Sequence, residues 1–487
     1  PAGWAANFNN PRVDWGYHTE PQKELDGREI FWPRGKVVGG SSAINGMIYI
    51  RGVPLDFEIW AQSGARGWSY EEVLPSFRNA EKQQTHHDEF HGTDGQLHVQ
   101  DVVDTRAIHE AFIDAWGAIG VPRNRDFNGA DQAGAGYYQF TQKDGRRWSA
   151  ASAYLDPVKA RPNLEVMTKT LVNHVRFEGK KAVGLSVRRS GVTETIEANR
   201  VILSGGAINS PQLLELSGVG DGERLQRHGI PVVHHSPGVG ENLQDHVFTK
   251  VVYGCHPQYS INREVQGVEL AKSALKWALM RSGPLTMGSA AVGAFWYTRE
   301  GLEAPDVQVH FASGATMYSQ GGRIRALDVP AVTAVVDQNR PQSRGSIHIA
   351  STSPHDPPRI DPNYLSEEVD RQTMVDGLRL LMSVFRQAPL QPYLTERMAP
   401  FPDNDDPTDD ELLDYIRGDA STTYHPTCTC MMGDHDGAVV SPALDVHGVE
   451  NLYVVDASVM PTVVSGNTNA ATIMIAEKAA ETLLAAS

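Results

Sequence analysis

The feature that most constrains the fold is a short apolar stretch that ends in two glycines and continues into a helix. Val201–Ser204 has the pattern of a buried strand, and Gly205 and Gly206 follow it directly. We expect the next helix to begin near Ser210-Pro211, with serine as its cap and proline in its first turn. A strand, a glycine turn and a helix in this order form the unit with which α/β proteins bind nucleotides.

The rest of the chain adds strands and helices of two kinds. Strand patterns and helical repeats alternate along it, and we expect strands at 164–167, 172–177, 182–187, 330–338, 345–350 and 452–455, and helices at 265–281, 409–417 and 468–484. Asn467 lies near the cap of the last helix. The sequence therefore predicts an α/β fold, α+β overall. An α/β nucleotide-binding part is assembled from separated segments, and an inserted part is built on an antiparallel sheet flanked by helices.

The composition excludes several classes of function. The 487 residues carry 43 basic and 59 acidic side chains, and the formal net charge is 43 − 59 = −16. An acidic chain of this size repels phosphate backbones, so no nucleic-acid partner is expected. No run of apolar residues is long enough for a transmembrane segment. The sequence starts at Pro1 without a signal peptide, and we expect this start to lie already inside a folded protein.

The three cysteines indicate a reducing compartment rather than a disulfide framework. Cys428 and Cys430 form a lone C-x-C near His425, with too few further ligands nearby for zinc, so no metal is expected.

Five motifs occur in a fixed order along the chain. They are Arg34–Met47 with its Gly39-Gly40-Ser41-Ser42 tract, Gly205–Leu214, Pro237–His246, Tyr424–Gly433 and Val455–Asn469. Each has an ordinary structural explanation on its own. A glycine-rich loop is common, Asn467 could be only a helix cap, and His425 is one of 18 histidines.

Taken together, the five motifs resemble the glucose–methanol–choline oxidoreductases, and within them the bacterial alcohol and choline dehydrogenase branch. The resemblance runs from about Pro1 to the C-terminus. It includes Trp32–Lys36, Ile50-Arg51-Gly52, Asn242–His246, Asp361–Leu365 and Gly466–Asn469. It implies a discontinuous FAD-binding domain over 1–75, 160–248 and 430–487, and a substrate-binding domain over 76–159 and 249–429.

The resemblance also implies a reaction, in which a primary alcohol is oxidised to the aldehyde by hydride transfer to flavin N5. His425 matches the base that removes the hydroxyl proton, and Asn467 matches the residue that holds the substrate oxygen. A histidine titrates near neutrality and suits the first task. An amide N–H can stabilise the charge that develops on the oxygen.

The same resemblance gives the expected flavin contacts. They are Gly39, Gly40, Ser41, Asn45, Gly46, Met47, Val172, Gly205, Asp456, Ala457, Asn467 and Thr468. Some family members bind FAD covalently through a histidine in the Gly-Gly-Ser-Ser loop. Here Ile44 takes that position, so the FAD is expected to be non-covalent.

The substrate and the electron acceptor stay open at this point. Choline is an alternative to a simple primary alcohol. A quinone or another acceptor is favoured over NAD or oxygen, although an oxidase is not excluded. The chain is expected in the cytoplasm, and a peripheral contact with the inner membrane is left open.

Two departures from the family pattern stand out. Cys428 and Met431 replace the glycine and arginine that usually follow the catalytic histidine. The chain also contains no G-x-G-x-x-G, the turn that binds the FAD pyrophosphate. About forty residues of the pattern are expected to be absent, from the usual size of a strand–helix–strand start, and the chain alone is expected to bind FAD poorly. An inactive or FAD-deficient remnant and a non-redox flavin lyase therefore stay as alternatives. A serine hydrolase is disfavoured because no G-x-S-x-G occurs.

Overall fold

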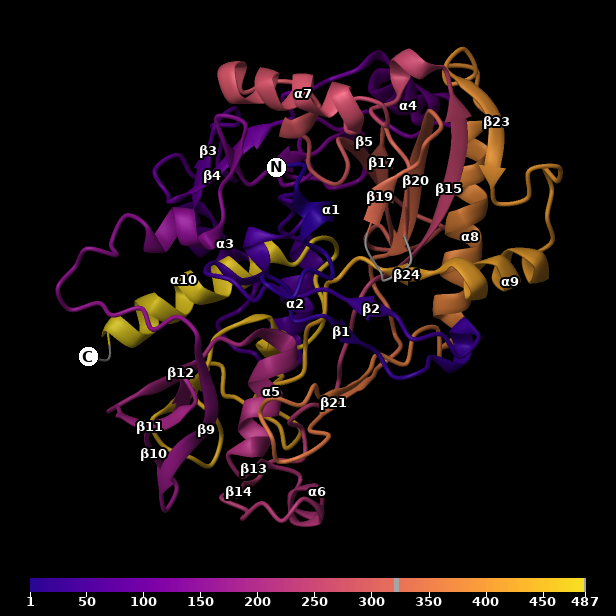
Figure 1. Cartoon of the computed structure of the whole chain (residues 1–487). Coiled ribbons are helices and arrows are strands. Elements are labelled where there is room, and N and C mark those ends of the chain that lie inside the picture. Colours follow the sequence, from indigo (N-terminus) through magenta and orange to yellow (C-terminus); the bar gives the residue numbers. More distant parts are fainter. Residues whose placement is uncertain (319–323, 486–487) are drawn as a thin grey trace.

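The fold is described from a computed structural model, in which residues 1–318 and 324–485 are described. Its largest element is a seven-stranded sheet with the order β23-β15-β20-β17-β16-β5, to which β24 adds beside β15 (Figure 1). All neighbouring pairs are antiparallel. The strands are β23 (Leu394–Ala399), β15 (Val247–Cys255), β20 (Ala331–Gln338), β17 (Val307–Ala312), β16 (Val292–Trp296), β5 (Gly134–Tyr137) and β24 (Ser421–Thr422).

Helices cover one face of this sheet. α8 (Glu368–Phe385) and α4 (Ala107–Ala118) pack against it, and the Phe311 ring of β17 stacks on Phe112 of α4 at 4.2 Å between centroids. Side chains alternate across a strand, so Gln308 and His310 face the opposite side from Phe311. Asp337 lies directly opposite Gln308 in the β17–β20 register and therefore shares that face. The second face of the sheet thus carries polar groups.

The other part of the chain contains the predicted nucleotide-binding unit. β12 (Val201–Leu203) pairs in parallel with β25 (Leu452–Val454), although about 250 residues separate them in the sequence. α5 (Gly206–Leu216) follows β12, and α10 (Asn469–Ala485) closes the chain. A three-stranded antiparallel sheet lies at the edge of this part (Figure 1), and its strands are β9 (Thr170–Glu178), β10 (Lys181–Arg189) and β11 (Val192–Glu197).

The remaining elements are shorter. The other helices of the described chain are α1 (Trp4–Asn7), α2 (Pro54–Gln62), α3 (Tyr70–Ala80), α6 (Gly222–Arg227), α7 (Gly267–Met280) and α9 (Asp409–Asp419). One small sheet contains β3 (Glu81–Gln83), β4 (Leu97–Asp101) and β6 (Gln139–Phe140). The other small sheets are pairs of strands: β1 (Tyr17–His18) with β2 (Phe31–Trp32), β7 (Gln142–Lys143) with β8 (Arg146–Arg147), β13 (Val219–Gly220) with β14 (His234–His235), β18 (Thr316–Tyr318) with β19 (Ile324–Ala326), and β21 (Ser346–His348) with β22 (Arg359–Asp361). The expected α/β class with an antiparallel sheet in the inserted part is confirmed.

Two local predictions were wrong. α5 begins at Gly206, four residues before the expected cap, because the Ser210 hydroxyl does not cap its own helix. It donates instead to Asp456 Oδ2 at 2.6 Å, and the N–H of Gly206 donates to the same oxygen at 2.8 Å. Residues 164–167 form no strand, since they lie on the surface without a pairing partner there.

Candidate functional site

His425 is held by its backbone in a buried position beside the second face of the large sheet. Its N–H donates to Asp245 Oδ1 at 2.6 Å, and its side chain is only 8% exposed. The other oxygen of Asp245 accepts from the hydroxyls of Tyr364 and Thr422. One buried carboxylate therefore fixes the segment that carries the histidine.

A second histidine determines which ring nitrogen of His425 carries the proton. His246 Nε2 lies 3.0 Å from the carbonyl oxygen of Asn339, so this nitrogen is the donor. His246 Nδ1 is then an acceptor in the neutral ring, and it lies 3.0 Å from His425 Nδ1. His425 consequently carries its hydrogen on Nδ1 and has its lone pair on Nε2. The sequence had matched His246 to a family motif without giving it a role.

Asn467 faces the free nitrogen of His425, and its amide orientation agrees with this assignment. Its Nδ2 lies 3.1 Å from His425 Nε2 and donates to it. Its Oδ1 accepts from Gln308 Nε2 on β17 at 3.2 Å. Asp56 on α2 holds the preceding turn, because Oδ2 accepts from the N–H of Ser465 at 2.7 Å. The two expected catalytic residues are therefore in direct contact.

The surroundings keep His425 neutral. Burial lowers the pKa of His425 well below its usual value, and the nearby His246, His310 and Arg34 lower it further. Burial likewise lowers the pKa of His246. A neutral buried imidazole with its lone pair on Nε2 can accept a proton from a hydroxyl group placed beside Asn467.

A carboxylate without a hydrogen-bond donor lies on the same face of the sheet. Asp337 is fully buried, and within residues 1–318 and 324–485 neither of its side-chain oxygens accepts a well-formed hydrogen bond. His310 Nε2 approaches Oδ1 at 3.2 Å. Oδ2 has no such neighbour in the described chain, and a buried carboxylate oxygen in this condition is costly unless a ligand supplies a donor or a positive charge.

The Gly-Gly-Ser-Ser loop is clamped by a partly buried arginine. Gly40–Ala43 form one 3₁₀ turn, and Arg147 donates to Asn45 Oδ1 at 2.6 Å and to the Asn45 carbonyl at 2.7 Å. Burial lowers the pKa of Arg147 to about 10. Among the described residues no carboxylate lies within ion-pair distance of this guanidinium.

The glycine turn after β12 meets the segment after β25. Gly205, Asp456 and Ala457 lie at the carboxyl ends of the two parallel strands, which is where α/β sheets bind their ligands. The Asp456 carboxylate accepts hydrogen bonds from Gly206, Ser210 and Ser458. The backbone next to Asp456, and not its carboxylate, is therefore available to a ligand.

Comparison with known proteins agrees with this arrangement. Residues 12–248 and 341–476 match the two domains of the family described as GMC oxidoreductase. The chain belongs to this family. The expectation drawn from the five motifs is thereby confirmed, and the chain is an oxidoreductase.

The similar proteins include choline and alcohol dehydrogenases. Human mitochondrial choline dehydrogenase is 42% identical over 484 residues, which cover 99% of this chain and 81% of that protein. An alcohol dehydrogenase (acceptor) of Pseudomonas putida is 40% identical over 489 residues, covering 99% and 88%. The crystal structure of pyridoxine 4-oxidase from Mesorbium loti has a TM-score of 0.88 at 29% identity, covering 99% of this chain and 90% of that one.

Membership of the GMC family implies FAD as the cofactor, and the residues present fit it. Gly40 and Gly206 have positive φ angles of 56° and 80°, and a Cβ on either would meet nothing within 4 Å. Arg147 offers a partly buried positive charge that pairs with no carboxylate of the described residues. Open glycine turns and an unpaired cation suit a group that joins a diphosphate to a planar ring. The Gly39–Met47 loop and Arg147 are the residues that would hold it.

Other expected flavin contacts have different surroundings. Met47 is buried with its sulfur near Gln142 Nε2, and Gly46 lies against Ser289. Thr468 directly precedes α10, and its carbonyl accepts from Thr472. Val172 lies in β9 opposite Val187. Their flavin contacts stay predictions.

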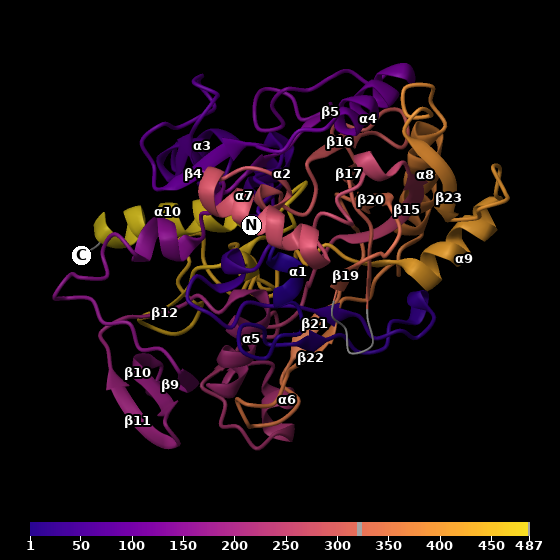
Figure 2. The same ribbon diagram turned by 45° about the horizontal axis from the view of Figure 1, so that its top comes forward.

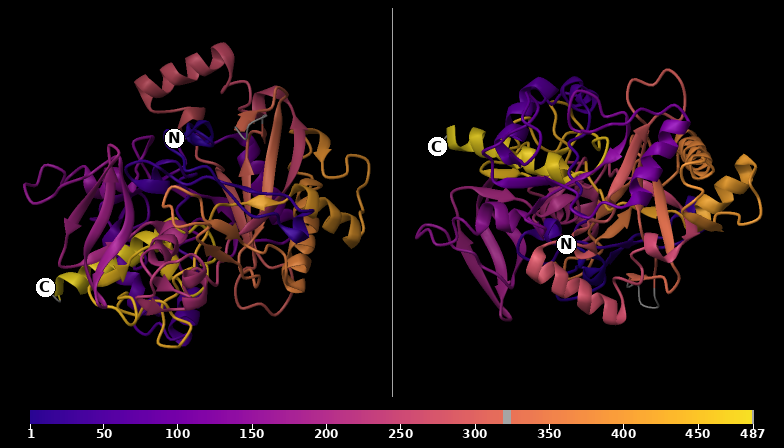
Figure 3. Two further views of the ribbon diagram at one scale, coloured as in Figure 1. Left: turned by 60° about the horizontal axis from the view of Figure 1, so that its bottom comes forward. Right: turned by 90° about the horizontal axis from the view of Figure 1, so that it is seen from above.

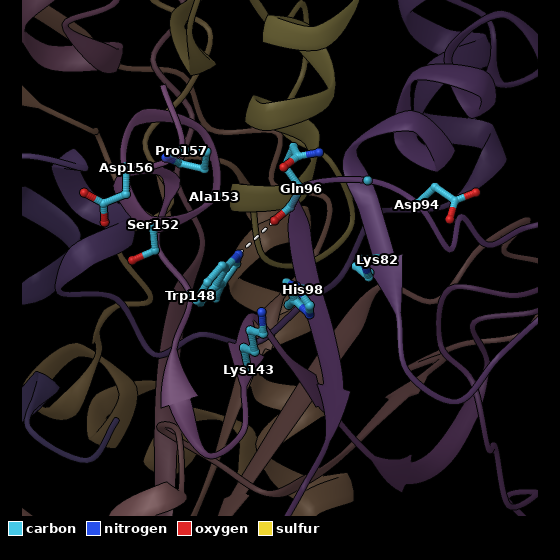
Figure 4. Close-up of a pocket in the computed structure, with 11 residues that line it drawn as sticks. Lys82, Asp94, Gln96, His98, Lys143, Trp148, Ser152, Ala153, Asp156 and Pro157 are labelled. Atoms are coloured by element: carbon cyan, nitrogen blue, oxygen red, sulfur yellow. Dashed lines mark hydrogen bonds between the residues drawn. The ribbon is translucent and has the colours of Figure 1, made fainter. Parts of the chain in front are cut away.

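The cavity in Figure 4 is formed by other residues than the expected catalytic and flavin-binding ones. It has a volume of about 430 Å³ and is lined by residues that include Lys82, His98, Lys143 and Trp148. The Trp148 indole N–H donates to the Gln96 carbonyl at 2.8 Å, which fixes the ring as a wall. None of the expected catalytic or flavin-binding residues lines this cavity.

The two departures after His425 have local structural consequences. Cys428 has a φ of 76°, in the left-handed region that favours the glycine usually found there. The Met431 sulfur accepts from Asn242 Nδ2 at 3.3 Å, so a thioether occupies the place of the usual cation.

The Cys428 backbone gives a stability prediction. Cys428→Gly and Cys428→Ala remove the same buried thiol, but only alanine keeps a Cβ in the left-handed conformation. We expect the glycine variant to be about 1 kcal/mol more stable than the alanine variant. Urea unfolding of the two proteins measures the difference. Equal stabilities would show that the backbone here relaxes without cost.

Proposed function

We propose that this chain oxidises a primary alcohol to the aldehyde with His425 as the base and Asn467 as the oxygen-binding residue. One observation carries the proposal. The hydrogen-bond chain from Asn339 through His246 leaves the lone pair of a neutral His425 on Nε2, beside the Asn467 amide. FAD, when bound, supplies the N5 acceptor for the hydride.

Each residue then has a defined task. His425 Nε2 takes the hydroxyl proton, which makes loss of hydride from the neighbouring carbon easier. Asn467 Nδ2 donates to the substrate oxygen while negative charge develops there. Gln308 fixes the amide by donating to its oxygen, and His246 fixes the tautomer of the base. His246 is therefore a positioning residue.

We further propose non-covalent FAD and an acceptor other than NAD. Ile44 stands where a covalent link would need a histidine, and its side chain is 4% exposed. The acceptor is proposed to be a quinone or a similar carrier, since one relative is named an alcohol dehydrogenase (acceptor). Other relatives are named oxygen-dependent choline dehydrogenases, so oxygen is the competing acceptor.

Choline is the second candidate substrate, and Asp337 is the observation that favours it. A buried carboxylate without a donor, on the face of the sheet shared with Gln308 and His310, suits a substrate with a quaternary ammonium group. The 42% identity to choline dehydrogenase points the same way.

The base is tested with His425→Ala. The kcat/KM of the native enzyme should be constant at high pH and fall at low pH, because only neutral His425 accepts a proton. The pH at the midpoint of this fall should lie below the usual imidazole pKa of about 6.5. The variant should lose about 10²- to 10⁴-fold in kcat and this acidic limb, with its FAD content retained. His355→Ala, at an exposed site, is the control. Full turnover of His425→Ala would refute the assignment.

The positioning role of His246 predicts a graded pair of variants. His425 Nδ1 has two neighbours at 3.0 Å, His246 Nδ1 and Thr423 Oγ1. His246→Leu removes the imidazole acceptor and leaves only the hydroxyl oxygen, so it should lower kcat about tenfold or more, with little change in KM. His246→Asn can place an amide oxygen near the same point and should recover much of the loss. Steady-state kinetics at equal FAD content measure both. Identical losses in the two variants would indicate a packing role only.

Asp337 predicts a charge-specific effect on the substrate. Asp337→Asn keeps the shape and removes the charge, so it should lower kcat/KM for choline while leaving 3,3-dimethylbutan-1-ol, the uncharged isostere, nearly unchanged. A loss of about tenfold on choline alone corresponds to about 1.4 kcal/mol. Equal losses on both alcohols would mean that Asp337 acts on the base instead of the substrate cation.

A further inference from the structure

α7 exposes more apolar surface than its position on the protein requires. Four of its side chains are at least 60% exposed, namely Val268 (74%), Leu275 (60%), Leu279 (75%) and Met280 (70%). Ser273 is the buried residue of this helix. Such a concentration of exposed apolar side chains usually marks an interaction surface.

Three of the four exposed apolar side chains form a stripe that points away from the body, and Met280 falls about 120° from Val268. At 100° per residue, Val268, Leu275 and Leu279 fall within about 40° of one another around the helix. Ser273 and Trp277 fall on the opposite side, and the Trp277 indole donates to the Gly145 carbonyl at 2.9 Å. This bond attaches the inner side of α7 to the protein, so the stripe is its outer side.

The views agree that α7 lies at the outside of the molecule. It crosses the front of the view in Figure 2, and it projects beyond the rest of the chain at the top of the left view in Figure 3. Its main contacts with other helices and strands are with η5 (Pro284–Thr286), the short 3₁₀ turn that follows it. α7 is therefore a convex ridge rather than part of a flat face.

Positive charges flank the stripe. Residues 267–281 contain Lys272, Lys276 and Arg281 against Glu269, a net charge of 3 − 1 = +2 on a chain of net charge −16. Lys272 Nζ pairs with Glu269 Oε1 at 2.6 Å, and the Arg281 guanidinium lies 4.4 Å from the Trp277 ring centroid on the inner side, so the lysines are the cations beside the stripe. By the same helical geometry, Lys272 and Lys276 lie about 40° and 80° from Val268, on one side of the stripe. Their long side chains can follow apolar surface while the ammonium groups stay in the polar layer.

We propose that α7 is an interfacial helix that docks this protein on an anionic phospholipid surface. An apolar ridge flanked by lysines matches the boundary between lipid head groups and acyl chains. A membrane accepts a single convex helix, whereas a stable protein interface needs about 800 Å² of complementary surface per partner. The helix lies flat in the interface. Among the described helices none is long and apolar enough to cross a membrane. The proposal does not depend on the reaction that the protein catalyses.

The test is flotation of the full chain with lipid vesicles in the presence of excess FAD. The native protein should float with vesicles of phosphatidylcholine and phosphatidylglycerol, and much less with phosphatidylcholine alone. Leu275→Gln/Leu279→Gln should lower binding about tenfold or more. Val192→Gln/Leu484→Gln changes two side chains of similar exposure elsewhere (60% and 77%) and should bind like the native protein. Lys272→Gln/Lys276→Gln should reduce the preference for anionic lipid.

The contrary outcomes are equally clear. Failure of the native protein to float, or equal binding by Leu275→Gln/Leu279→Gln and Val192→Gln/Leu484→Gln, would overturn the proposal. Dimers seen by light scattering without lipid and abolished by Leu275→Gln/Leu279→Gln would assign the stripe to a second copy of the chain instead. Dye reduction by an alcohol without vesicles should be the same in all four proteins, which separates this test from that of the proposed function.

Discussion

The hydrogen bond between the Nδ1 atoms of His246 and His425 is the interaction on which the site depends. Two neutral imidazoles can make this bond only if one ring donates and the other accepts. The Asn339 carbonyl settles which ring accepts, because it takes the proton of His246 Nε2. Everything proposed for the chemistry follows from this choice, since it leaves the lone pair of His425 on Nε2, the nitrogen that Asn467 Nδ2 faces.

The fold supplies the partners of this pair from distant parts of the chain. His246 precedes β15, Asn339 follows β20, and His425 follows β24, so the large antiparallel sheet brings them together. The alternation along β17 turns Gln308 and His310 to the same side, opposite the helices. The buried Asp245 then fixes the backbone of His425. The sheet thus acts as the rigid support of the site, while the parallel strands β12 and β25 carry the expected cofactor contacts.

Much of this could be predicted from the sequence, but only where a pattern was local or matched a family. The five motifs identified the family, and His425 and Asn467 proved to be neighbours. The start of α5 could not be predicted, because the Ser210 hydroxyl binds a carboxylate 246 residues away. The role of His246 was equally hidden, since it depends on a carbonyl 93 residues further on. Asp337 gave no signal because a carboxylate in a strand is unusual only once it is known to be buried without a donor.

The central claim is the tautomer of His425, and nuclear magnetic resonance of ¹⁵N-histidine-labelled protein tests it most directly. Two-bond ¹H–¹⁵N correlations show which ring nitrogen is protonated, and His425→Asn and His246→Asn variants assign the signals. At neutral pH we predict that His425 is neutral with its proton on Nδ1 and that His246 is neutral with its proton on Nε2. A proton on Nε2 of His425, or an imidazolium at that position, would contradict the account.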